Sequence, residues 1–126
     1  MMDSKHRIAA KTEQEPFSIR ELEGLQRLTF DYFLKETNPE NGLVPDSTRP
    51  GSACSIAPTG FALAAYPVAV ERRFITRDDA IRRTLTSLRF FSNSPQGPEP
   101  DATGYKGFYY HFLDMKTGRR TMDCEL

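Results

Sequence analysis

The stretch Ile56–Val70 constrains the fold of this chain more than any other, because it is apolar on every side. Small residues alternate with bulky ones such as Phe61 and Tyr66, and a helix without a polar face is normally an interior helix. Small residues let neighbouring elements approach closely, as buried packing requires. Pro67 removes a mid-helix hydrogen bond and predicts a kink or a split. The stretch is too short, and too interrupted by Pro58 and Pro67, for a convincing membrane span, so we expect a buried core helix.

An amphipathic helix is predicted before this stretch. Ser18 can cap its N-terminus and Glu21 completes a capping box, so the helix begins near Ile19. It ends before the segment 38–42, whose proline and glycine stop a helix. One apolar stripe runs along it, formed by Leu22, Leu25, Leu28 or Thr29, Tyr32 and Phe33.

A second amphipathic helix is predicted after the apolar stretch, with Thr76 as its cap and two first-turn carboxylates that suit the helix dipole. Its apolar stripe consists of Ile81, Leu85, Leu88 and Phe91, and its exposed ion pairs are predicted to be Asp78 with Arg82 and Asp79 with Arg83. Its arginine-rich outer face is predicted to be solvated, because no aromatic residues interleave the arginines.

The central helix needs cover on all sides, whereas each amphipathic helix offers only one apolar stripe. We therefore expect residues 17–126 to be the N-terminal part of a larger α-helical domain, with the missing C-terminal part of that domain as a partner. Residues 1–16 are polar, lack a sustained period and are predicted to form a disordered tail.

Residues 104–126 combine aromatics, one histidine and several carboxylates beside a tight turn. Residues 107–113 alternate as a strand does, and two faces result: Phe108, Tyr110 and Phe112 on one, Tyr109, His111 and Leu113 on the other. Asp114–Gly118 supplies the turn and Arg119–Met122 the returning strand, so a β-hairpin is predicted. Two interpretations stay open. The aromatics either belong to the core or present polar groups to a ligand, and Asp114 is either a ligand group or the first residue of the turn.

The long segment 41–52 contains apolar residues and is therefore expected to lie against the body of the protein. Asp46 is its carboxylate. Two interpretations of Asp46 stay open: it either caps a nearby turn or helix, or faces a ligand.

Composition excludes several classes of partner. The 126-residue chain carries 17 basic and 17 acidic side chains, so nothing in its net charge favours nucleic acid or an anionic membrane. Cys54 and Cys124 match no metal-site spacing, and free thiols are favoured over a disulfide. No metal or cofactor is expected. The N-terminus shows no secretory signal, so the chain as written is expected in the cytoplasm.

Taken together, a series of short motifs resembles the bacterial glucoamylase-like family from about Phe17 onward: Phe30–Phe33, Asn38–Asp46, Gly60–Leu63 with Tyr66–Pro67, Ile75–Arg77, Leu88–Phe91, Pro95–Gly97, Gly104–Asp114 and Cys124–Leu126. The resemblance implies an all-α fold, a partial (α/α)6 toroid of inner and outer helices with a small β-hairpin near the C-terminus. It also implies a cavity at one end of the toroid. For longer relatives it leaves periplasmic or secreted locations open.

The family is associated with glycoside hydrolysis and includes enzymes that act on β-1,2-glucans. Such hydrolysis needs two carboxylates. The resemblance therefore implies Glu125 and Asp114 as catalytic candidates, with Tyr110, His111 and Asp46 as groups that bind an oligo- or polysaccharide. Glu125 has the alternative of a helix-entry carboxylate. A different function stays open, a non-enzymatic helical module that docks a partner protein on the apolar central helix.

Overall fold

The structure is a computed structural model and describes residues 17–126. The predicted tail at residues 1–16 lies outside the described residues. The described part contains three helices and four two-residue strands: α1 (Ile19–Glu36), β1 (Cys54–Ser55), α2 (Ile56–Glu71), α3 (Arg77–Asn93), β2 (Gly104–Tyr105), β3 (Phe108–Tyr109) and β4 (Phe112–Leu113). The prediction of a mostly helical fold with a small hairpin near the C-terminus is confirmed.

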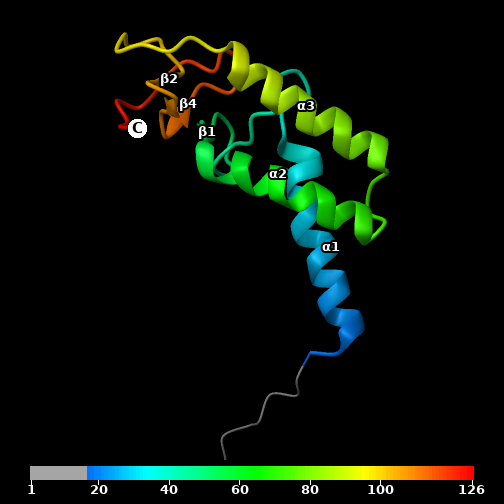
Figure 1. Cartoon of the computed structure of the whole chain (residues 1–126). Coiled ribbons are helices and arrows are strands. Elements are labelled where there is room, and N and C mark those ends of the chain that lie inside the picture. Colours follow the sequence, from blue (N-terminus) through cyan, green and yellow to red (C-terminus); the bar gives the residue numbers. More distant parts are fainter. Residues whose placement is uncertain (1–16) are drawn as a thin grey trace, which may run out of the picture.

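The elements are arranged as a helical layer and a loop end (Figure 1). The helical layer consists of α1, α2 and α3, in which α2 and α3 lie side by side and the first half of α1 projects away from them. The loop end consists of residues 38–55 and 94–126, which gather where α2 begins and α3 ends. Helix α2 contacts both other helices, as an inner helix between two outer ones would.

The helix boundaries follow the predicted caps. The Ser18 side chain accepts a hydrogen bond from the Glu21 amide, and the Glu21 carboxylate accepts one from the Ser18 amide, which completes the capping box of α1. Thr76 caps α3 by accepting a hydrogen bond from the Asp79 amide. Helix α2 continues through Pro67, so the alternative of a split at this proline is wrong.

The core of the helical layer forms where the helices cross. Its buried residues are Phe30, Val44, Ala62, Tyr66, Ala69 and Ala80. Tyr66 is 0% exposed and meets Phe30 edge to face, with the ring centroids 6.4 Å apart. Val44 comes from the long segment before β1, which confirms that this segment lies against the body.

The predicted apolar stripes of the outer helices are covered only in part. Tyr32 and Phe33 of α1 pack against the core of the helical layer, and Phe91 of α3 meets the ring of Tyr109. In α1, Phe30 is the buried residue, whereas the leucines of the predicted stripe are exposed, Leu28 to 70%. In α3, Ala80 and Ser87 are buried and three stripe residues, Ile81, Leu85 and Leu88, are exposed. The ion pair on α3 joins Asp79 to Arg82, which are three residues apart, whereas the predicted pairs are four residues apart. Small residues face the core because α2 and α3 approach closely.

Within the described residues, α2 is not covered on every side. Phe61 is 66% exposed and Val68 is 47% exposed. That the central helix needs more neighbours than residues 17–126 supply stays a prediction, and these exposed apolar side chains are the surface that such neighbours would cover. No helix in this part of the chain has the length and apolar character needed to cross a membrane.

The predicted continuous strand over residues 107–113 is interrupted. β2 and β3 form an antiparallel hairpin closed by Lys106 and Gly107, both at positive φ (52° and 87°) as a type I′ turn requires. The chain then bends, and β4 pairs with β1 instead. The predicted turn at 114–118 does exist, closed by a bridge between Leu113 and Arg120.

The bend also changes the faces of this segment. Tyr110 and Leu113 are buried, while Phe108 is 71% exposed, so the predicted alternation is wrong. A second core lies beneath the loop end and consists of Leu43, Cys54, Ala102, Tyr110 and Leu113. Both cysteines are free thiols, as favoured from the sequence, and burial raises the pKa of the Cys54 thiol.

Candidate functional site

A buried hydroxyl on α2 helps to hold the loop end in place. Thr59 donates a hydrogen bond to the Ser55 carbonyl (3.0 Å) and accepts one from the Val44 amide (3.2 Å). Beyond Val44, the chain folds back on itself. Pro45 bridges Cys54, and the Asp46 amide donates to the carbonyl of residue 53 (2.8 Å). These bonds hold the loop 46–53 as a defined rim at the N-terminal end of α2.

This loop forms one wall of an open hollow of about 410 Å³, named here the Asp46 hollow. The opposite wall comes from β4 and the C-terminal segment. The complete lining is Asp46, Ser47, Arg49, Pro50, Gly51, Ser52, Ala53, Phe112, Thr121 and Met122. A carboxylate, a guanidinium, hydroxyls and an aromatic ring therefore border one space, a combination typical of sites for small polar ligands.

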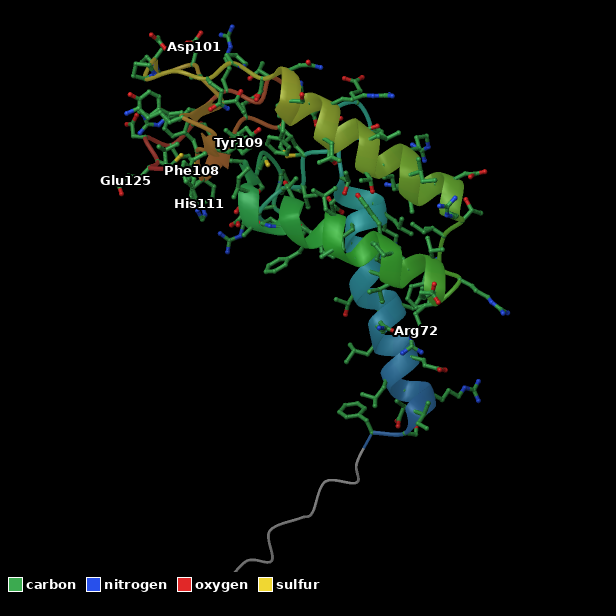
Figure 2. The ribbon with its side chains drawn as sticks, viewed as in Figure 1. Arg72, Asp101, Phe108, Tyr109, His111 and Glu125 are labelled. Carbon is green, nitrogen blue, oxygen red and sulfur yellow. The ribbon has the colours of Figure 1, made fainter. Side chains whose placement is uncertain are left out.

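His111 and Glu125 lie beside this hollow. The His111 amide donates to the Glu125 carbonyl (3.0 Å), and the Phe112 amide donates to the Cys124 sulfur (3.1 Å), so the C-terminal segment runs along β4. The His111 ring meets Phe112 edge to face at 4.4 Å between centroids. Figure 2 shows His111 and Glu125 at the same end of the molecule, both directed outward.

Tyr110 points into the body. Its hydroxyl donates to the Gly97 carbonyl (3.2 Å), and the guanidinium of Arg120 lies 4.4 Å from its ring centroid. These contacts join three segments of the loop end. The Tyr110 side chain is buried, so it contributes to the second core and does not border the Asp46 hollow.

Asp114 acts as the first residue of a turn. Its Oδ1 accepts hydrogen bonds from the Lys116 amide (3.0 Å), the Thr117 amide (2.7 Å) and the Thr117 hydroxyl (2.8 Å). The bonds from Thr117 are the main reason why the pKa of Asp114 lies below its ordinary value. The contacts of Asp114 are those of the first residue of a turn, as one of the two interpretations from the sequence predicted. A catalytic role for this residue stays a prediction.

The structure thus divides the five predicted site residues. Asp46 borders a hollow with Phe112, the His111 ring meets Phe112, and the Glu125 carbonyl accepts from the His111 amide. Tyr110 is buried in the second core, and Asp114 stabilises an exposed turn. Sequence reasoning did not nominate Arg49 or Phe112 for the hollow. A weak signal for Arg49 was its place before Pro50 and Gly51, in the loop that carries Asp46.

Three other hollows differ in character. One of about 390 Å³ lies between α1 and α2 and one of about 500 Å³ between α2 and α3, and both are walled mainly by apolar side chains. A polar hollow of about 450 Å³ lies at the end of α3, bordered by Arg89 and Asn93. Within residues 17–126, no three His, Cys, Asp or Glu side chains gather closely enough to hold a metal ion.

No protein-family model matches the sequence. A crystal structure of a glucoamylase-like protein from Bacteroides uniformis is similar at 33% identity and a TM-score of 0.69, over 86% of this chain and 25% of that one. The resemblance to the glucoamylase-like proteins is confirmed. A second glucoamylase-like structure, from Bacteroides fragilis, matches at 21% identity and a TM-score of 0.63 over 86% of this chain and 26% of that one, which supports the fold.

A curated relative comes from Parabacteroides distasonis and is an exo β-1,2-glucooligosaccharide sophorohydrolase. It is 29% identical over 100 residues, which are 78% of this chain and 13% of the relative. The chain therefore spans about a quarter of the solved structures and about an eighth of this hydrolase. Its fold is part of the glucoamylase-like toroid, and its relatives include a glucan hydrolase.

Proposed function

We propose that this chain forms part of the carbohydrate-binding end of a glycoside hydrolase that acts on glucans, with β-1,2-linked gluco-oligosaccharides as the substrate class. The observation that carries the proposal is the 29% identity over 100 residues to the Parabacteroides distasonis sophorohydrolase. The loop end supports it, because an acidic side chain, a histidine and a hollow with polar and aromatic walls lie together there.

Glycoside hydrolysis needs a proton donor to the leaving oxygen and a second carboxylate, which acts either as nucleophile or as the base that activates water. Glu125 is the proposed acid or base, because it is exposed beside His111 at the loop end. Asp114 keeps its proposed role as a second polar anchor, although its Oδ1 already serves the turn. His111 and Asp46 are proposed to bind sugar hydroxyls.

We further propose that residues 1–126 alone bind sugar weakly and do not cleave it. The reason is that residues 17–126 match only about a quarter of the length of the similar solved structures, so most of the toroid that encloses a substrate lies outside this match. Release of reducing sugar from a β-1,2-glucan by the purified chain would overturn this point.

A chimera tests the proposed function. The aligned 100-residue stretch of the Parabacteroides distasonis enzyme is replaced by the matching stretch of this chain, and hydrolysis of β-1,2-gluco-oligosaccharides is measured. The proposal predicts an active chimera, whose kcat falls by about 10²- to 10⁴-fold on Glu125→Gln if Glu125 transfers the proton. A folded but inactive chimera would contradict the proposed function, and a normal rate in the Glu125→Gln chimera would remove Glu125 from it.

The alternative, a helical module that docks a partner protein, is favoured by the exposure of Phe61 and Val68 on α2. It makes a different prediction. Phe61→Ser would then abolish binding of the partner protein, while Glu125→Gln would leave that binding unchanged.

A further inference from the structure

The Asp46 hollow brings together side chains that suit a sugar ring. Phe112 contributes an apolar ring, Asp46 a carboxylate that accepts hydrogen bonds, and Arg49 a planar fork of donors. Ser47 and Ser52 add hydroxyls. A pyranose has an apolar face of C–H groups and a rim of hydroxyls that both donate and accept, so each wall of the hollow has a matching part of the ligand.

The charged groups of the hollow are available to a ligand. Asp46 and Arg49 are both exposed, and in the described part of the chain neither side chain takes part in an ion pair. The backbone that carries them is fixed, because the Asp46 amide bonds the carbonyl of residue 53 (2.8 Å) and the Ser47 amide bonds the Ser52 hydroxyl (3.1 Å). A rigid rim with unoccupied polar groups is preorganised for binding.

The two large apolar hollows do not share this chemistry. Between α1 and α2 the walls are formed mainly by leucines, phenylalanines and small apolar residues, and between α2 and α3 by Tyr66, Ile81 and their neighbours. These surfaces suit the packing of further protein, because they offer few hydrogen-bonding groups to a sugar. The polar hollow at the end of α3 also combines a carboxylate, a guanidinium and a ring, from Glu40, Arg89 and Phe90. The Asp46 hollow differs from it because it is bordered by a predicted site residue, Asp46, and by Phe112, whose ring meets that of His111.

From this geometry we infer that the Asp46 hollow is a subsite for one glucopyranose unit. The exposed part of Phe112 packs against the apolar face of the sugar, Asp46 accepts from neighbouring hydroxyls and Arg49 donates to them. Because the Phe112 ring borders the hollow and meets the His111 ring, a sugar in this subsite lies next to His111, one of the groups proposed to bind sugar hydroxyls. The inference rests on the proposed function, which selects glucose among polyhydroxylated ligands.

Titration of the purified chain with sophorose, the β-1,2-linked glucose disaccharide, tests the subsite. Backbone amide NMR shifts are expected in residues 46–53 and at Phe112, Thr121 and Met122. Asp46→Asn is expected to weaken binding about tenfold, because one charge-assisted acceptor is lost. Phe112→Leu is expected to weaken it about fivefold through loss of the aromatic face.

Two matched variants control for general effects. Asp101→Asn removes an exposed carboxylate and Phe108→Leu removes an exposed aromatic ring, and neither residue borders the hollow (Figure 2). Both variants should bind sophorose as the unchanged chain does. Equal weakening by the controls, shifts confined to other surfaces, or no binding of sophorose would each overturn the subsite.

The subsite and the proposed function can fail separately. If the chimera is active but the Asp46 hollow binds no sugar, the subsite is wrong and the proposed hydrolase function is supported. If sophorose binds in the Asp46 hollow but the chimera is folded and inactive, the subsite is supported and the proposed hydrolase function is contradicted.

Discussion

The helical layer and the loop end are stabilised in different ways. In the helical layer, apolar side chains such as Phe30 and Tyr66 pack where helices cross, and large apolar residues such as Phe61 stay exposed. In the loop end, the second core is smaller, and many hydrogen bonds to the backbone fix the conformation around it. For example, the side-chain amides of Asn38 and Asn41 both donate to the Met115 carbonyl (2.8 and 3.0 Å).

The difference shows how the two regions divide their roles. Packing is tolerant of small shifts, whereas hydrogen bonds to particular carbonyls place a loop in one conformation. A sugar-binding rim needs its groups held in fixed positions. The loop end meets this need, while the exposed faces of the helical layer are suited to contact with other protein.

The largest predicted contrast is between two glycines. Gly118 has φ +68°, and a Cβ there would overlap the ring of Phe90, so Gly118→Ala should destabilise the protein by about 3 kcal/mol. Gly24 lies in α1 with no atom near its Cβ position, so Gly24→Ala should stabilise by up to about 1 kcal/mol. Urea unfolding of both variants measures the difference. Equal effects would show that the two regions do not differ as described.

Two tyrosine hydroxyls give the next contrast. The buried Tyr66 hydroxyl has no hydrogen-bond partner within the described residues, so Tyr66→Phe should leave stability unchanged or raise it by about 1 kcal/mol. Tyr110→Phe removes the bond to the Gly97 carbonyl and should cost about 1 kcal/mol. Thermal unfolding of the pair decides the point, and a larger loss for Tyr66→Phe would contradict this account of the helical core.

The smallest contrast concerns pH. Because the pKa of Asp114 is lowered in the folded protein, its ionised form stabilises the turn above the ordinary aspartate pKa. This contribution is lost as the pH falls through the lowered pKa. Asp114→Asn should therefore cost less than about 1 kcal/mol at neutral pH, and the difference should shrink as the pH falls through the lowered pKa.

Unfolding in urea at several pH values measures this dependence. If the loss of unfolding free energy caused by Asp114→Asn grew as the pH fell, the ionised carboxylate would not be the form that stabilises the turn, and the prediction would be wrong.

The sequence predicted the helix boundaries well, because Ser18, Glu21 and Thr76 form local caps that need no tertiary information. It predicted only in part which faces are covered, since Tyr32 and Phe33 do pack against the core. Leu25 and Leu85 have the spacing of core residues, yet coverage depends on which neighbours are present, and local periodicity does not contain that information. Close helix packing instead selected the small residues Ala80 and Ser87.

The loop end was predicted less fully. The alternation over residues 107–113 predicted one strand. In the structure, Phe112 and Leu113 pair with Ser55 and Cys54, which requires a bend after β3. That pairing joins segments far apart in the sequence and has no local signal. For the same reason the Asp46 hollow, which joins residues 46–53 to Phe112, could not be assembled from motifs alone.

Hydrogen–deuterium exchange with and without excess sophorose tests the central claim most directly, because it reports on both regions in one experiment. The account predicts slower exchange in residues 46–53 and 111–125, with exchange on the exposed faces of α2 and α3 unchanged. Protection confined to α2 and α3, or no protection anywhere in the chain, would contradict it.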